Sequence, residues 1–152
     1  MGEMTAVEAL AEERSGVRSV RLRIPAKAEY IALARLALAG LAELSGMDEE
    51  TFADLKLALT EAVSNSIRHA YDQAGGHVEI AYGLNATHLE VEVVDDGAGF
   101  DPERPPVLDG EELAEGGLGI AIIRTIVDEL EIQSQPGVRG SRLRFVKRIR
   151  EQ

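Results

Sequence analysis

The sequence contains no cysteine and no tryptophan among its 152 residues, and only 4% of the chain is aromatic. The absence of cysteine excludes disulfide bonds, a thiolate nucleophile and a cysteine-ligated zinc site. Because aromatic residues are scarce while 45% of the residues are hydrophobic, we expect a core built from Leu, Ile, Val and Ala. The length is typical of a single domain.

Positive charge is also scarce, since 16 Lys and Arg residues stand against 27 Asp and Glu residues and give a formal net charge of -11. Binding to nucleic acid requires a basic surface, so this balance argues against a direct nucleic-acid partner. It fits instead a protein that meets a basic protein or carries a metal ion. The sequence has no apolar run of membrane-spanning length and does not open with a signal peptide. We therefore expect a cytoplasmic protein without membrane contact.

The spacing of apolar residues predicts an α+β domain. We expect residues 1–16, which are mostly polar and acidic, to form a flexible tail or a frayed helix. Alternating apolar residues predict strands at 17–25, 77–84, 88–96, 131–135 and 141–149. Helical spacing predicts helices at 27–46, 49–70 and 119–130. This order of elements indicates one domain over residues 17–150, a two-layer sandwich in which helices cover one face of a mixed sheet.

The segment LALTEAVSNSIRHAY at residues 57–71 combines a helix core with a polar face. The apolar positions that we expect in the core are Leu57, Leu59, Val63 and Ile67. Glu61, Asn65 and His69 repeat at steps of four, so they lie on one face beside that core. This face is either a solvated helix edge or, if a phosphate site is near, a source of a magnesium ligand (Asn65) and a general base (Glu61). We expect His69 to be structural, contacting carbonyl groups at the helix end.

Asp95 ends the predicted strand at 88–96 on the same face as the apolar residues Leu89, Val91 and Val93. A carboxylate at the end of a buried face needs a hydrogen-bonding partner, because burying it alone is costly. Asp95 therefore either caps the turn that follows or accepts a hydrogen bond from a ligand amino group at the mouth of a pocket.

Two groups of glycines bracket residues 97–117, where the apolar periodicity stops. Gly97 and Gly99 would allow a ligand to approach the backbone closely. Gly116, Gly117 and Gly119 precede a predicted helix, whose first N–H groups can bind an anion such as phosphate. Taken alone, the first group also fits a calcium loop or a plain turn, and the second fits a flexible linker.

Taken together, these three segments resemble a known nucleotide-binding family. E-x-x-x-N at residues 61–65, D-x-G-x-G at 95–99 and G-x-G at 117–119 are similar to the N box and the two glycine boxes of the GHKL (Bergerat) ATP-binding fold. The layout, with EAVSNSIRHAY and GGLGIAIIRTIVDELEI, most resembles the anti-sigma-factor serine/threonine kinases of the RsbW and SpoIIAB type. The resemblance covers residues 18–149.

The resemblance implies a role for each site residue. The residues implied to bind ATP are Asp95 at the adenine amino group, Gly97 and Gly99 around the adenine, Ser141 behind it, and Gly117, Leu118 and Gly119 at the phosphates. Asn65 would ligate Mg²⁺, Glu61 would deprotonate the acceptor serine or threonine, and residues 100–116 would form an ATP lid. The family sequesters an alternative sigma factor, phosphorylates a small STAS-domain anti-anti-sigma factor, and commonly forms homodimers.

One departure from the family pattern leaves two other functions open. Relatives often carry an arginine just before the second glycine box, positioned for the terminal phosphate. Here that stretch reads GEELAEGG, with three glutamates, and Arg104 is the only Lys or Arg among residues 100–116. The alternatives to a kinase are a nucleotide-binding GHKL module that binds a protein partner without phosphotransfer, and a stand-alone ATPase domain of the histidine-kinase type.

Overall fold

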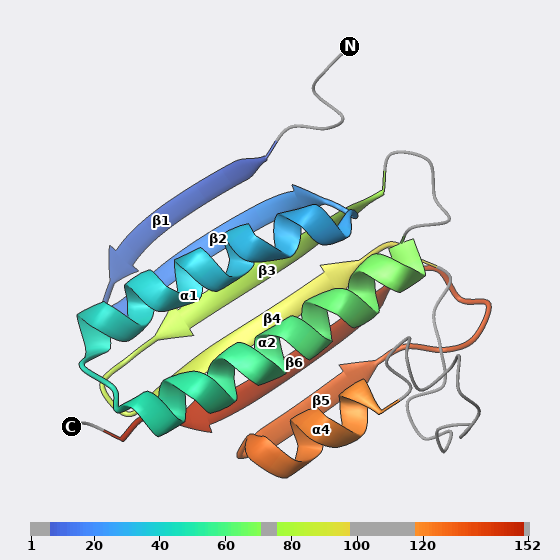
Figure 1. Ribbon diagram of the computed structural model, residues 1–152. Helices are drawn as coiled ribbons and strands as arrows, with labels where there is room; N and C mark the ends of the chain where they lie inside the picture. The colour runs from blue at the N-terminus through green and yellow to red at the C-terminus, as the bar shows by residue number, and fades with distance from the viewer. Residues whose placement is uncertain (1–6, 71–75, 98–117, 151–152) are drawn as a thin grey trace.

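The computed structural model describes residues 7–70, 76–97 and 118–150 (Figure 1). The strands of its sheet are β1 (Glu8–Arg14), β2 (Val17–Pro25), β3 (His77–Leu84), β4 (His88–Asp95), β5 (Glu129–Gln133) and β6 (Ser141–Arg148). The helices are a short 3-10 helix η2 (Ala28–Tyr30), α1 (Ile31–Ser45), α2 (Glu49–Ala70) and α4 (Gly119–Ile126). The strand order in the sheet is β1-β2-β3-β4-β6-β5.

The helices lie on one face of this sheet and leave the other face uncovered (Figure 1). Side chains alternate along each strand, so that Val78, Ile80 and Tyr82 of β3 are buried beneath the helices while Glu79 is exposed. The hydroxyl of Tyr82 donates a hydrogen bond of 2.8 Å to the carbonyl oxygen of Ala34 in α1, which ties the sheet to the helical layer. The α+β two-layer architecture predicted from the sequence is confirmed.

The sheet is antiparallel rather than mixed, which corrects one detail of the prediction. All five pairings between neighbouring described strands are antiparallel. The two α-helices α1 and α2, with the short η2 before them, connect β2 to β3. The chain thus crosses the sheet face twice, and β3 runs opposite to β2. β4 and β5 run in the same direction, but β6 lies between them and pairs with both.

Residues 8–14 form the edge strand β1, where we expected a tail or a frayed helix. The strand pairs with β2 from Glu8 opposite Arg23 to Arg14 opposite Val17. Between the two strands, Ser15 and Gly16 have φ angles of 53° and 78°, and positive φ at both central residues is characteristic of the tightest hairpin turns. Every side chain of β1 is exposed, so the strand carries no buried apolar face that its sequence could reveal.

The predicted helix at 119–130 is wrong at its end, since α4 stops at Ile126 and Val127 is extended. The backbone N–H of Asp128 then bonds to Val146 of β6 at 2.9 Å, and β5 begins at Glu129. The apolar residues in this stretch fit both a helix and a strand, and pairing with β6 decides between them.

The helix predicted at 49–70 is confirmed, although one residue of its expected core is not buried. Asp48 caps the helix, because the N–H of Thr51 donates to its carboxylate at 2.8 Å. Hydrogen bonding from the side chain of Thr51, and then from its backbone, lowers the pKa of Asp48. Leu55 and Leu59 are fully buried, whereas Leu57 is 43% exposed. With about 100° of rotation per residue, Leu57 lies about 160° from Leu59 and faces away from the sheet.

No helix in the described ranges is long and apolar enough to cross a membrane.

Candidate nucleotide-binding site

Four chain segments that carry predicted site residues meet at one end of the molecule. They are the C-terminal half of α2, the end of β4, the start of β6 and the start of α4 (Figure 1). α2 packs against both α4 and β4, and Glu61 on α2 lies against Gly119 at the start of α4. The fold therefore gathers residues that are far apart in the sequence.

Asp95 is buried at the end of β4 and has a donor on each carboxylate oxygen. The side chain is 4% exposed, and its Oδ1 accepts the backbone N–H of Gly97 at 2.8 Å. Ser141, directly opposite in β6, donates its hydroxyl to Oδ2 at 2.6 Å. Asp95 thus caps the turn, which was one of the two interpretations of the sequence. A carboxylate offers about four acceptor positions, so these two bonds leave capacity for a ligand N–H as well.

The turn before β6 holds the loop after β4 in place. The backbone N–H of Gly140 donates to the carbonyl oxygen of Gly97 at 2.7 Å. Gly140 has a φ of 92°, which favours glycine, and a Cβ atom there would lie 3.5 Å from the carbonyl oxygen of Asp95. The hydrogen bond between Gly140 and Gly97 therefore fixes the backbone next to Asp95, both after β4 and before β6.

Three polar residues share one face of α2 beside the site. At about 100° of rotation per residue, Asn65 lies about 40° from Glu61 around the helix axis. Arg68 lies about 20° from Glu61 in the opposite direction of rotation. Glu61 is half-buried, whereas Asn65 is only 8% exposed. The guanidinium Nη2 of Arg68 donates to Oδ1 of Asn65 at 3.4 Å. Our sequence prediction did not include Arg68, although its i+3 step from Asn65 could have indicated it.

Glu61 lies directly against the start of α4. A Cβ atom on Gly119 would be only 2.8 Å from Oε1 of Glu61, so the absence of a side chain at Gly119 permits this approach. Leu118 at the N-cap makes no side-chain hydrogen bond to the helix start, and the N–H of Ile122 bonds to the carbonyl of Leu118. The N–H groups of the first turn therefore have no acceptor within the helix, as an anion site requires.

Other predicted site residues lie outside the described residues. Gly99 and Gly117 belong to the stretch 98–117, together with the whole of the predicted lid, and the side chain of His69 is also outside. Within the described ranges, no group of three or more His, Asp or Glu residues could hold a metal ion. Mg²⁺ at Asn65 would accept further oxygen ligands from the nucleotide and from water.

The described residues fit an adenine nucleotide with magnesium. A buried carboxylate with spare acceptor positions suits an exocyclic amino group, a buried amide oxygen suits Mg²⁺, and a helix that starts with glycine suits phosphate.

Comparison with protein-family models identifies residues 24–147 as a histidine kinase-like ATPase domain. The chain belongs to this family. It is 37% identical over 128 residues to the serine-protein kinase RsbW of Oceanobacillus iheyensis, covering 78% of this chain and 81% of that protein. It is 34% identical over 140 residues to the serine-protein kinase RsbW of Bacillus cereus strain AH187, covering 85% and 86% of the two chains. These identities place it in the RsbW group of serine-protein kinases.

Solved structures show the same fold at low sequence identity. A crystal structure of the RsbU and RsbW domains of a Mycobacterium tuberculosis protein matches with a TM-score of 0.60 and 20% identity, covering 85% of this chain and 32% of that one. The histidine kinase domain of a blue-light-activated kinase from Erythrobacter litoralis matches with a TM-score of 0.52 and 19% identity, covering 97% and 68%. The GHKL fold predicted from the sequence is confirmed, and membership of this ATPase family implies ATP binding.

Proposed function

We propose that this protein is an anti-sigma factor with ATP-dependent serine/threonine kinase activity. It sequesters an alternative sigma factor and phosphorylates a STAS-domain anti-anti-sigma factor. The observation that carries this proposal is the position of Glu61, whose carboxylate lies against Gly119 at the uncapped start of α4. A base beside a phosphate-binding helix start is placed to take a proton from a hydroxyl group that attacks the terminal phosphate.

The remaining site residues bind and orient the nucleotide in this proposal. Asp95 accepts a hydrogen bond from the adenine amino group, and Ser141 holds the second carboxylate oxygen of Asp95. Gly97 and Gly99 shape the adenine pocket, and Asn65 provides an amide oxygen for Mg²⁺. The backbone N–H groups offered to the phosphates belong to Gly117, Leu118 and Gly119. ATP bound with Mg²⁺ supplies the phosphoryl group, and Glu61 accepts the proton of the serine or threonine hydroxyl.

The partners in this proposal follow from the RsbW relatives and from charge. A net charge of -11 complements a basic sigma-factor surface, and complementary charge accelerates association. We propose a cytoplasmic homodimer without direct nucleic-acid or membrane contact.

A second candidate is a GHKL module that binds nucleotide and a protein partner but transfers no phosphate. Its support is the acidic sequence before the second glycine box, with Glu111, Glu112 and Glu115 in place of the arginine that relatives often carry. Phosphoryl transfer depends on stabilising the charge of the transferring group, so a lid without this cation favours binding without transfer.

Capture of partners from a lysate of the source organism, in the presence of Mg-ATP, separates these functions. Mass spectrometry that finds a STAS protein with phosphoserine or phosphothreonine supports the kinase. The same partner without phosphate supports the binding module. A histidine-phosphotransfer protein in place of sigma and STAS proteins would assign the chain to the histidine-kinase type.

A further inference from the structure

The outer face of α1 exposes apolar side chains at a regular spacing. Leu36 and Leu44 are 66% and 61% exposed, and Gly40, midway between them, is exposed as well. These three residues repeat at steps of four and form one ridge along the helix. The only polar residues of α1 are Arg35, Glu43 and Ser45. A helix that is apolar on nearly all sides is normally buried, so the ridge indicates a docking surface.

Neither the backbone nor the space around it requires a glycine at position 40. Gly40 is not among the glycines with a positive φ, and a Cβ atom there would meet nothing within 4 Å. In the interior of a helix, glycine is less favourable than alanine. A glycine in the middle of an apolar ridge does allow a second backbone to approach closely. Gly40 therefore fits a helix of another chain that crosses α1 at this point.

The C-terminal end of the ridge borders a hollow of about 370 Å³. Leu44 lines this hollow together with Leu84 and Ile149, and its charged lining consists of Glu13 and Arg18. These two form an ion pair at 2.9 Å, and Arg18 also donates to the carbonyl oxygen of Leu44 at 3.4 Å. Because the two charged groups bind each other, the hollow offers its apolar lining to an apolar side chain of a partner.

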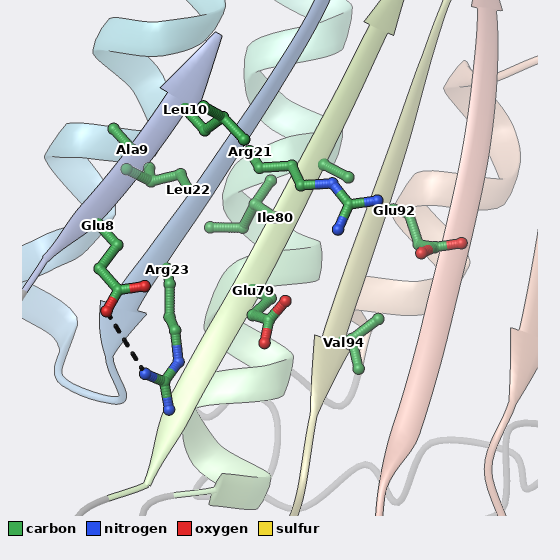
Figure 2. A pocket seen from close by; sticks show the side chains of 11 residues that line it. Glu8, Ala9, Leu10, Arg21, Leu22, Arg23, Glu79, Ile80, Glu92 and Val94 are labelled. Carbon is green, nitrogen blue, oxygen red and sulfur yellow. Dashed lines mark ion pairs between the residues drawn. The ribbon is translucent and has the colours of Figure 1, made fainter. Parts of the chain in front are cut away.

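The uncovered face of the sheet is a less favourable docking surface, because it carries paired charges. Figure 2 shows its groove, in which Arg23 and Glu8 form an ion pair at 4.0 Å. On the neighbouring strands, Arg142 pairs with Glu92. Covering such pairs removes water from charged groups, which costs free energy. The ridge on α1 can be covered without this cost.

We propose that α1 of a second copy of the chain packs across α1 in an antiparallel arrangement, with the two Gly40 residues at the crossing. The inference rests on the proposed function, since it assigns a surface to the proposed homodimer. Leu36 and Leu44 lie four residues on either side of Gly40. A two-fold axis at Gly40 therefore places Leu36 of one copy opposite Leu44 of the other, beside the hollow.

The net charge of the chain also favours this ridge as the contact between two copies. Each copy carries a net charge of -11, so most pairs of surfaces on two copies repel each other. The ridge itself consists of uncharged residues, and apolar area buried between the copies stabilises their contact.

Sedimentation equilibrium of the full chain measures the dissociation constant of the dimer. Leu36→Glu and Leu44→Glu each place a charge on the ridge, and each substitution acts twice in a symmetric dimer. Leu57→Glu is the matched control, because Leu57 is a leucine 43% exposed on α2 rather than on the ridge. Circular dichroism confirms that each variant is folded.

We expect Leu36→Glu and Leu44→Glu to raise the dissociation constant by on the order of tenfold or more, the scale of one buried leucine. Leu57→Glu should leave the dissociation constant unchanged. Gly40→Ala should raise the melting temperature at concentrations where the chain is monomeric, because alanine favours the helix, and yet weaken the dimer. A glycine without a role in the contact would give the first effect alone.

The outcomes separate this interface from the homodimer as such. A wild-type dimer that persists in both leucine variants would overturn the interface and leave the homodimer intact. Equal weakening by Leu57→Glu, or an unchanged dissociation constant in Gly40→Ala, would also overturn it. A wild-type protein that stays monomeric at high concentration would refute the interface and the proposed homodimer together, while calorimetry with Mg-ATP would test the nucleotide site independently.

Discussion

Replacing Asp95 with asparagine tests the adenine site with a change of almost no volume. Oδ1 of Asp95 accepts the N–H of Gly97 at 2.8 Å, and Oδ2 accepts the hydroxyl of Ser141 at 2.6 Å. The N–H of Gly97 can only donate, whereas the hydroxyl of Ser141 can rotate and accept. The asparagine should therefore turn its oxygen toward Gly97 and its NH₂ group toward Ser141.

The variant then offers the adenine amino group a neutral oxygen on the Gly97 side and a donor on the Ser141 side, in place of a charged acceptor on both sides. A hydrogen bond to a charged group is worth about 1.5–3 kcal/mol, and about 1.4 kcal/mol corresponds to tenfold in affinity. We therefore expect Asp95→Asn to weaken ATP binding by about tenfold to a hundredfold. Folding should survive, because the bonds to Gly97 and Ser141 can both be remade.

Calorimetric titration with Mg-ATP measures the change in affinity, and thermal unfolding followed by circular dichroism confirms that the variant is folded. Asp96→Asn is the matched control, because this substitution makes the same chemical change at the exposed position next to Asp95. Wild-type affinity in a folded Asp95→Asn protein would refute the adenine assignment.

Three further predictions concern the base, the helix start and the core. Glu61→Ala should abolish phosphate transfer while the calorimetric affinity for Mg-ATP stays near wild type, and a variant that still phosphorylates its partner would remove Glu61 from the role of base. Gly119→Ala should displace the carboxylate of Glu61, which lies 2.8 Å from the new Cβ position; the transfer rate should fall while the melting temperature holds, and an unchanged rate would contradict the proposed geometry. Tyr82→Phe should lower the free energy of unfolding by about 1 kcal/mol through loss of the hydrogen bond to Ala34. Burial raises the pKa of Tyr82 in the folded protein. The stabilisation by its neutral phenol is therefore complete below the unfolded pKa of about 10 and is progressively lost as the pH rises above that value. Urea unfolding from pH 8 to 11 should show a steeper loss of stability in wild type than in Tyr82→Phe.

The sequence predicted the elements that have a buried face and missed those decided by pairing. The strands at 77–84 and 88–96 alternate clearly because the helices cover one side of each. β1 has no buried residue, so only its hairpin turn and its pairing with β2 define it. The end of α4 is set by the hydrogen bond of Asp128 to β6. The spacing of apolar residues within the segment gives no information on this pairing.

In the candidate site, too, the pattern within one segment predicted some features, and contacts between segments decided the others. The parity of Asp95 with the buried residues of its strand predicted a carboxylate in need of a partner, and the structure supplies Gly97 and Ser141. Ser141 itself was indicated only by the family resemblance, because its position opposite Asp95 depends on the register between β4 and β6. The approach of Glu61 to Gly119 likewise depends on how α2 packs against α4.

Phosphate transfer to a STAS partner tests the central claim most directly. The purified protein and its Glu61→Ala variant would each be incubated with Mg-ATP and the captured STAS protein, and modified residues would be mapped by mass spectrometry. We predict phosphoserine or phosphothreonine on the partner with the wild-type protein and none with the variant. A wild-type protein that binds both ATP and the STAS protein but leaves the partner without phosphate would contradict the kinase assignment.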